Sequence, residues 1–191
     1  MITVERNKTA LLVMDLQSEI VTMFGDKAPP LLERTAGLVA AARTAGLPIV
    51  YVVVGCRPGY PELNPKNATF AAIAKSGRFI MSEPPAASVA PEVRPHDGDV
   101  VVVKRRVNAF FGTDLDLVLR AKGVDTLVLT GLSTSGVVLS TVRYGADSDY
   151  KLVVVKDCCA DPDEEVHRVL TEKVFVRQAT VTSAAELIAA L

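Results

Sequence analysis

The sequence predicts a three-layer α/β/α domain built on a six-stranded parallel sheet, with the strands in the order 3-2-1-4-5-6. Six short apolar runs, rich in β-branched residues, alternate with helical patterns along the chain. The runs are hydrophobic almost throughout, which is typical of strands covered on both faces by helices. A chain of 191 residues that is 49% hydrophobic suits one domain, so we expect residues 1–191 to form a single unit.

The expected strands share this apolar, β-branched composition. They cover residues 10–14, 48–54, 99–103, 126–130, 151–155 and 179–182. Right-handed crossovers should connect them, since nearly all parallel strand pairs are joined in that way.

Helical patterns fill most of the gaps between the strands. They predict helices over residues 30–45, 113–122, 135–147, 163–173 and 184–191. Thr113, with Asp116 three residues later, resembles a capping box at a helix start. Gly46 and Gly123 follow their helices, where glycine is favoured at a C-terminus.

Composition excludes several classes of protein. The 21 Lys and Arg residues nearly balance 22 Asp and Glu residues, so neither nucleic acid nor an anionic membrane is an expected partner. The first eight residues do not resemble a signal peptide, and no apolar run approaches the about 20 residues that span a bilayer. We therefore expect a cytoplasmic protein.

Cysteine and histidine usage favours neither disulfides nor metal. Three cysteines, two of them adjacent at 158 and 159, do not make a disulfide framework. His96 and His167 lack the neighbouring ligands of a zinc motif. We expect no metal and no cofactor, buried inert cysteines, and His167 on a solvated helical face.

Polar residues stand where apolar strands end. Asp15 follows the first strand, Lys104 follows the third, and a glycine- and hydroxyl-rich run at residues 131–136 follows the fourth. Ligands of open parallel sheets gather beyond the carboxyl ends of the strands. We therefore expect Asp15, Lys104 and the start of the next helix, with Val137, to line one crevice. The long Pro- and Gly-rich segment 55–98 leaves the same edge and should wall this crevice.

Several motifs in this order resemble those of the isochorismatase-like hydrolase superfamily. They are MDLQ at 14–17, KRRVNAF at 104–110, GLST at 131–134 and VKDCCA at 155–160. The resemblance covers almost the whole chain. It implies an Asp-Lys-Cys triad, and carrying it over residue by residue gives Asp15 and Lys104 but places Val137 at the nucleophile position.

A valine cannot attack a carbonyl carbon, so the resemblance implies loss of the covalent route. Family members that act on isochorismate also lack the thiol, and there the aspartate is thought to protonate a vinyl ether. The resemblance further implies a cis peptide at Leu132-Ser133 and assembly into homodimers or homotetramers. Residues 56–65 hold no histidine, which disfavours a metal-dependent nicotinamidase.

The remaining candidates would bind a small, anionic substrate. Gln17 belongs to the family's Asp-x-Gln motif, and Phe111 is expected in the pocket wall. Backbone N–H groups near Ser133 and Thr134, before the helix, would hold an anion. Arg57 and Tyr60 either grip a substrate carboxylate or only shape a turn, whereas Arg105 and Arg106 are expected to be solvated.

These features favour a small-molecule hydrolase that works without a cysteine nucleophile, with a vinyl ether such as isochorismate as a candidate substrate. Asp15 would be its general acid or base, and Lys104 the electrostatic partner of Asp15. The alternative is a family member that kept the pocket but lost the chemistry, and serves as a binding or regulatory protein.

Overall fold

The computed structural model describes residues 4–191 and confirms the predicted sheet. Six strands run parallel in the order β3-β2-β1-β4-β5-β6. Their bounds are β1 (Thr9–Met14), β2 (Ile49–Val54), β3 (Val100–Lys104), β4 (Thr126–Leu132), β5 (Lys151–Ala160) and β6 (Thr180–Thr182). Strand β5 is longer than predicted, because it resumes pairing with β4 after an irregularity, with Cys159 opposite Gly131.

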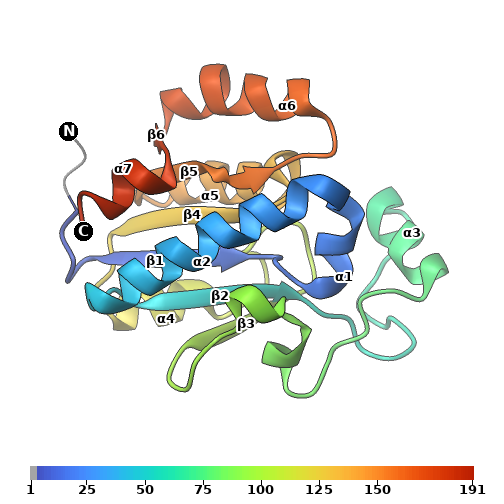
Figure 1. Cartoon of the computed structure of the whole chain (residues 1–191). Coiled ribbons are helices and arrows are strands. Elements are labelled where there is room, and N and C mark those ends of the chain that lie inside the picture. The colour runs from blue at the N-terminus through green and yellow to red at the C-terminus, as the bar shows by residue number, and fades with distance from the viewer. Residues whose placement is uncertain (1–3) are drawn as a thin grey trace.

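Helices cover both faces of this sheet (Figure 1). The α-helices are α1 (Ser18–Val21), α2 (Ala28–Thr44), α3 (Ala68–Ser76), α4 (Leu115–Ala121), α5 (Leu139–Asp147), α6 (Glu164–Val169) and α7 (Ala184–Ile188). Helices α2 and α7 pack on one face, while α4 and α5 lie on the other. Tighter or wider helical turns occupy Thr22–Lys27, Pro85–Ser88, Pro91–Val93, Thr134–Val138, Leu170–Val174 and Phe175–Arg177.

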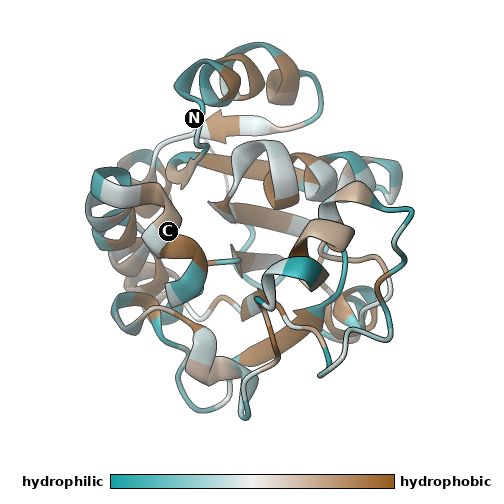
Figure 2. Cartoon of the chain, turned by 90° about the vertical axis from the view of Figure 1, so that its right-hand side faces the viewer, coloured by the Kyte–Doolittle hydropathy of each residue, from teal (hydrophilic) through white to brown (hydrophobic). Residues whose placement is uncertain are grey.

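The core consists of two apolar clusters, one on each face of the sheet. Leu11 and Val13 of β1 belong to the cluster under α2, and Leu12 and Met14 belong to the cluster under α4 and α5. Successive side chains of a strand point to opposite faces, so a strand buried on both sides must be hydrophobic at every position. Figure 2 shows the strands in brown, surrounded by helices with hydrophilic outer segments.

The helix ends correct one sequence-based expectation and confirm another. Thr113 and Asp116 do not form a capping box, because the Thr113 N–H already donates to the carbonyl of Phe110 and the Asp116 carboxylate binds the Tyr150 hydroxyl. Gly46 and Gly123 adopt the left-handed conformation, with φ of 76° and 68°, that ends a helix.

The segment between β2 and β3 contains a helix that the sequence analysis did not predict. Helix α3 begins after Asn67, whose side chain accepts the N–H of Phe70. Phe70 is buried, and α3 lies at the end of the molecule toward which β1 and β2 point (Figure 1). In the described part of the chain, no helix is long and apolar enough to cross a membrane.

Candidate active site

A cavity of about 260 Å³ lies at the carboxyl ends of β1, β3 and β4. Asp15, Lys104, Ser133 and Val137 all contribute to its lining, as the positions of these residues along the sequence predicted. Most of the remaining wall is apolar and includes Phe70 from α3. The segment between β2 and β3 therefore walls the cavity, which confirms the expectation for residues 55–98.

Asp15 and Lys104 form a buried ion pair within this cavity. The Lys104 Nζ lies 2.9 Å from Asp15 Oδ2, and the two residues are only 3% and 6% exposed, respectively. The same ammonium donates to the main-chain carbonyl of Arg106 at 3.1 Å. Among residues 4–191, the buried Oδ1 of Asp15 has no hydrogen-bond partner. One carboxylate oxygen is thus fixed by Lys104, and the other is buried without a partner among the described residues.

The surroundings of Asp15 favour its protonated form. Burial raises the pKa of the carboxyl group above its ordinary value, and the neighbouring Lys104 opposes this shift. Asp15 also has a left-handed backbone, with φ of 57°. Such a conformation is uncommon outside glycine and clusters at functional sites.

Gly131 brings β4 against the end of β1. It pairs with Met14, directly before Asp15, and its φ is 141°. A Cβ atom at this position would lie 2.2 Å from the Met14 carbonyl oxygen, so only glycine fits. Shortly after Gly131, the peptide bond between Leu132 and Ser133 is cis, as the family resemblance implied.

Val137 lies in the wide helical turn Thr134–Val138 between β4 and α5. The α-helix that was predicted to begin at residue 135 therefore begins only at Leu139. Gly136, within this turn, has a non-helical backbone with φ of −95° and ψ of −105°. Val137 is 2% exposed, yet it contributes to the cavity wall.

The residues after β5 hold this turn in place. Asp161 accepts the N–H of Ser135 at 2.7 Å, and Thr134 Oγ1 shares a hydrogen bond of 2.8 Å with His167 Nδ1. His167 is half-buried, not solvated as expected, and this burial lowers its pKa. Thr134 is buried in the same contact and does not line the cavity.

Four other predicted binding residues lie outside the cavity lining. The Gln17 amide is buried and exchanges two hydrogen bonds with the backbone of Val54. Arg57 is exposed, 3.8 Å from Glu62, and the Tyr60 hydroxyl donates to the carbonyl of Arg78. These three side chains hold loops together. Phe111 is 64% exposed and lines a neighbouring groove instead.

The two arginines after Lys104 are half-buried, which corrects the expectation that they are solvated. Arg105 forms an ion pair with Glu62 at 3.1 Å. The Arg106 guanidinium lies 5.3 Å from the centre of the Phe70 ring. The sequence signal for these contacts was weak, because adjacent basic residues are usually solvated and their partners come from the segment between β2 and β3.

All three cysteines are buried, which confirms the prediction for Cys158 and Cys159. Burial raises the pKa of Cys158 to about 11 and also raises the pKa values of Cys56 and Cys159. None of them lines the cavity that contains Asp15. Within the described residues, no cluster of three or more His, Cys, Asp or Glu side chains is arranged to hold a metal ion.

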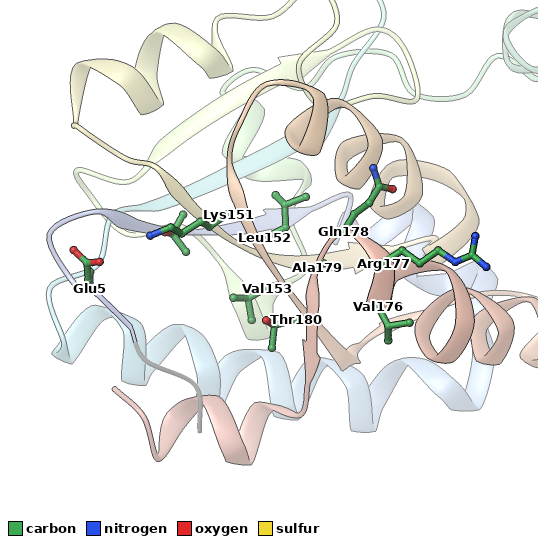
Figure 3. A pocket seen from close by; sticks show the side chains of 10 residues that line it. Glu5, Lys151, Leu152, Val153, Val176, Arg177, Gln178, Ala179 and Thr180 are labelled. Carbon is green, nitrogen blue, oxygen red and sulfur yellow. The ribbon is translucent and has the colours of Figure 1, made fainter.

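A larger cavity, of about 620 Å³, lies at the opposite edge of the sheet, where β4 and β5 begin (Figure 3). Its wall includes Lys151 and Arg177, whose charged ends point away from one another in this view. Polar groups of a binding site normally converge on the ligand. The smaller cavity, with its ion pair, is therefore the candidate active site.

Comparison with known proteins places this chain in a family. The isochorismatase domain matches residues 9–186. The isochorismatase family protein YecD of Escherichia coli O157:H7 is 34% identical over the full length of both chains. Ureidoacrylate amidohydrolase RutB of Methylorubrum extorquens is 31% identical, over 82% of this chain and 71% of its own. A solved isochorismatase family structure from Burkholderia thailandensis has a TM-score of 0.80 at 28% identity and covers 100% of this chain and 99% of its own.

The chain belongs to the isochorismatase family, and the expectation of an isochorismatase-family hydrolase is confirmed. The predicted fold class is confirmed as well.

Proposed function

We propose that this chain hydrolyses a small molecule without a cysteine nucleophile, using Asp15 as the general acid and base and Lys104 as its electrostatic partner. The observation that carries the proposal is the state of Asp15. One of its carboxylate oxygens is held by Lys104 at 2.9 Å, while the other is buried with no partner among the described residues. Position 137, where the family resemblance implies a thiol, holds a valine.

The reaction that this arrangement favours is the hydrolysis of a vinyl ether such as isochorismate. Protonated Asp15 transfers its proton to the terminal vinyl carbon, so that a C–H bond forms and the adjacent carbon becomes an oxocarbenium ion. Water adds to that carbon and returns a proton to Asp15. The resulting hemiketal breaks its C–O bond to release an alcohol and a ketone. A carboxyl group whose pKa is raised by burial is suited to the first step.

Lys104 stabilises the charged form of Asp15 between the two proton transfers. After the first proton transfer, Asp15 is a buried carboxylate, and an isolated buried charge is costly. The ammonium at 2.9 Å compensates this charge until water returns the proton.

The chemistry of the thiols supports the same proposal. Cys56, Cys158 and Cys159 are buried away from the cavity, and burial raises their pKa values, so little reactive thiolate forms. General acid–base catalysis typically contributes about 10²–10⁴-fold, which suffices for an activated vinyl ether but not for a stable amide. An ether is therefore the favoured substrate.

Two further expectations belong to this proposal. The substrate is an anion, because the half-buried Arg106, in a groove beside the cavity, has no ion-pair partner among the described residues. The chain also assembles into a homodimer or homotetramer, which would cover exposed large apolar side chains such as Leu117 and Val176. Light scattering of the purified protein measures the assembly, and a monomer would contradict that part.

The decisive experiment is a turnover screen followed by one substitution. Vinyl ethers that resemble isochorismate, simple esters and simple amides are assayed with the purified chain. The amides are included because a relative is named as an amidohydrolase. We expect turnover of the vinyl ethers and a loss of at least about 10²-fold in kcat/KM for Asp15→Asn, because an amide cannot transfer the proton.

Asp97→Asn provides the matched control, because Asp97 is exposed and does not line this cavity. Its activity should stay within twofold of the parent chain. Unchanged turnover in Asp15→Asn would overturn the mechanism. Binding of a vinyl ether without any turnover would instead favour the alternative predicted from the sequence, a binding protein that has lost the chemistry.

A further inference from the structure

A groove of about 340 Å³ lies next to the candidate active site. Phe70 and Val107 line both hollows, so a molecule that passes over them reaches from one hollow into the other. The walls of the groove also include Arg106, Phe111 and Tyr144. Phe111 thus lines a hollow beside the active site, although it does not line the cavity of Asp15.

Arg106 is the only cationic residue in the lining of this groove, and its side chain is held in place. Its Nη1 donates to the carbonyl of Arg105 at 2.5 Å, and its Nη2 donates to the carbonyl of Glu62 at 3.0 Å. The guanidinium also lies over the Phe70 ring. A guanidinium carries five N–H donors, so these two bonds leave donors free to bind a ligand.

Arg106 has no ion-pair partner within the described residues. The nearby carboxylate of Glu62 is shared by Arg57 and Arg105. Asp15, the carboxylate that lines the cavity, is paired with Lys104. Lys104, Arg57 and Arg105 thus each have a counter-charge, whereas the half-buried Arg106 has none among the described residues. A half-buried cation without a counter-charge favours an anionic ligand.

The backbone joins Arg106 to the reacting groups. Lys104, which binds Asp15, also donates to the main-chain carbonyl of Arg106 at 3.1 Å. The backbone of Arg106 is therefore tied to the ion pair, and its side chain lines the adjoining groove.

We propose that Arg106 binds a carboxylate at one end of the substrate, in the groove, while the other end enters the apolar cavity beside Asp15. The assignment of the reacting end rests on the proposed function, but the anion site does not. The substrate class is then an elongated carboxylate with an unsaturated portion at its reacting end. Arginine suits this task because its planar donors match the two oxygens of a carboxylate.

Binding of two unreactive probes tests this assignment. Cinnamate carries a carboxylate on a flat, unsaturated skeleton, and cinnamyl alcohol is its neutral counterpart. Dissociation constants are measured by NMR titration at low ionic strength. We expect Arg106→Gln to weaken cinnamate binding about tenfold or more and to change cinnamyl alcohol binding less than twofold.

Arg177→Gln is the charge-matched control, since Arg177 lines the larger cavity at the opposite edge of the sheet. It should change neither dissociation constant by more than twofold. Equal weakening of cinnamate by Arg177→Gln and Arg106→Gln would reduce the effect to the overall charge of the protein and overturn the site. Weakening by Arg57→Gln but not by Arg106→Gln would assign the carboxylate to the loop arginine, and would also overturn it.

A second variant guards against misfolding. Arg106→Lys retains the charge but loses the planar pair of donors, and we expect cinnamate binding about threefold weaker at an unchanged melting temperature. Unchanged binding in both folded variants overturns the proposal. Because neither probe is hydrolysed, the outcome is independent of the proposed function. Loss of cinnamate binding in Arg106→Gln with no vinyl ether turnover by the parent chain would reject the chemistry alone.

Discussion

Asp15 and Lys104 oppose one another in setting the proton affinity of the site. Burial raises the pKa of Asp15, whereas the ammonium of Lys104 lowers it. A general acid is active only in its protonated form, so the rate should fall as the pH rises through the pKa of Asp15. The lysine therefore sets the upper pH limit of activity.

Removal of this ammonium should move that limit upward. In Lys104→Met the carboxylate of Asp15 loses its counter-charge, so its pKa rises further and the falling limb of kcat/KM shifts by about one pH unit or more. The pH profile of a vinyl ether substrate measures the shift, with Lys122→Met, an exposed lysine, as the control. A limb that stays in place or moves to lower pH would contradict the assigned role of Lys104.

Position 137 offers a second test at the level of single residues. We expect the thiol in Val137→Cys to be alkylated by iodoacetamide faster than any native cysteine, because Val137 lines the cavity beside Lys104. Mass spectrometry after a brief exposure measures the labelled fraction. Val138→Cys is the matched control, since Val138 is equally buried but does not line the cavity. Equal labelling of the two variants would mean that residue 137 is closed to ligands.

At the level of elements, the candidate active site depends on how β4 ends. The strand runs against Met14 of β1 at Gly131 and then continues into the turn Thr134–Val138, which Asp161 and His167 hold from the end of β5 and from α6. The sequence indicated that a reactive turn follows β4. It did not indicate the contact with His167, because charged neighbours in the sequence suggested an exposed helix face.

Substitution of Gly131 should disrupt this arrangement. A Cβ atom in Gly131→Ala meets the Met14 carbonyl oxygen at 2.2 Å, and the backbone has a φ of 141°. We expect a loss of about 3 kcal/mol or more in the free energy of unfolding, measured by urea denaturation. Gly37→Ala in α2 meets no atom within 4 Å and should be neutral or stabilising. Similar stability for the two variants would contradict the close approach.

At the level of the whole molecule, the sheet was predictable because its signal is local. Each strand is a hydrophobic run, and the burial of β1 on both faces follows directly from its composition. Asp15 and Lys104 were predictable because each stands at the end of a strand. Helix α3 and the half-buried Arg106 were not, since their environment is formed by contacts between the segment after β2 and the residues after β3, which no local pattern encodes.

Burial of the cysteines in the folded chain has a consequence for the reactivity of their thiols. Cys56, Cys158 and Cys159 are all buried, so iodoacetamide should leave turnover of the folded protein unchanged. Labelling of all three should appear only as urea unfolds the sheet, and mass spectrometry across the transition measures it. Loss of activity on labelling of the native protein would show that one of these thiols serves the reaction.

Lys104 contacts residue 106 through its carbonyl oxygen, not through its side chain. Every amino acid carries that oxygen, so any residue at position 106 can accept the hydrogen bond from the Lys104 ammonium. The guanidinium, by contrast, is lost when a single mutation replaces Arg106. Descendants of this chain can thus exchange one preferred substrate for another at residue 106, while Lys104, two residues before the change, keeps its contacts with that carbonyl and with Asp15.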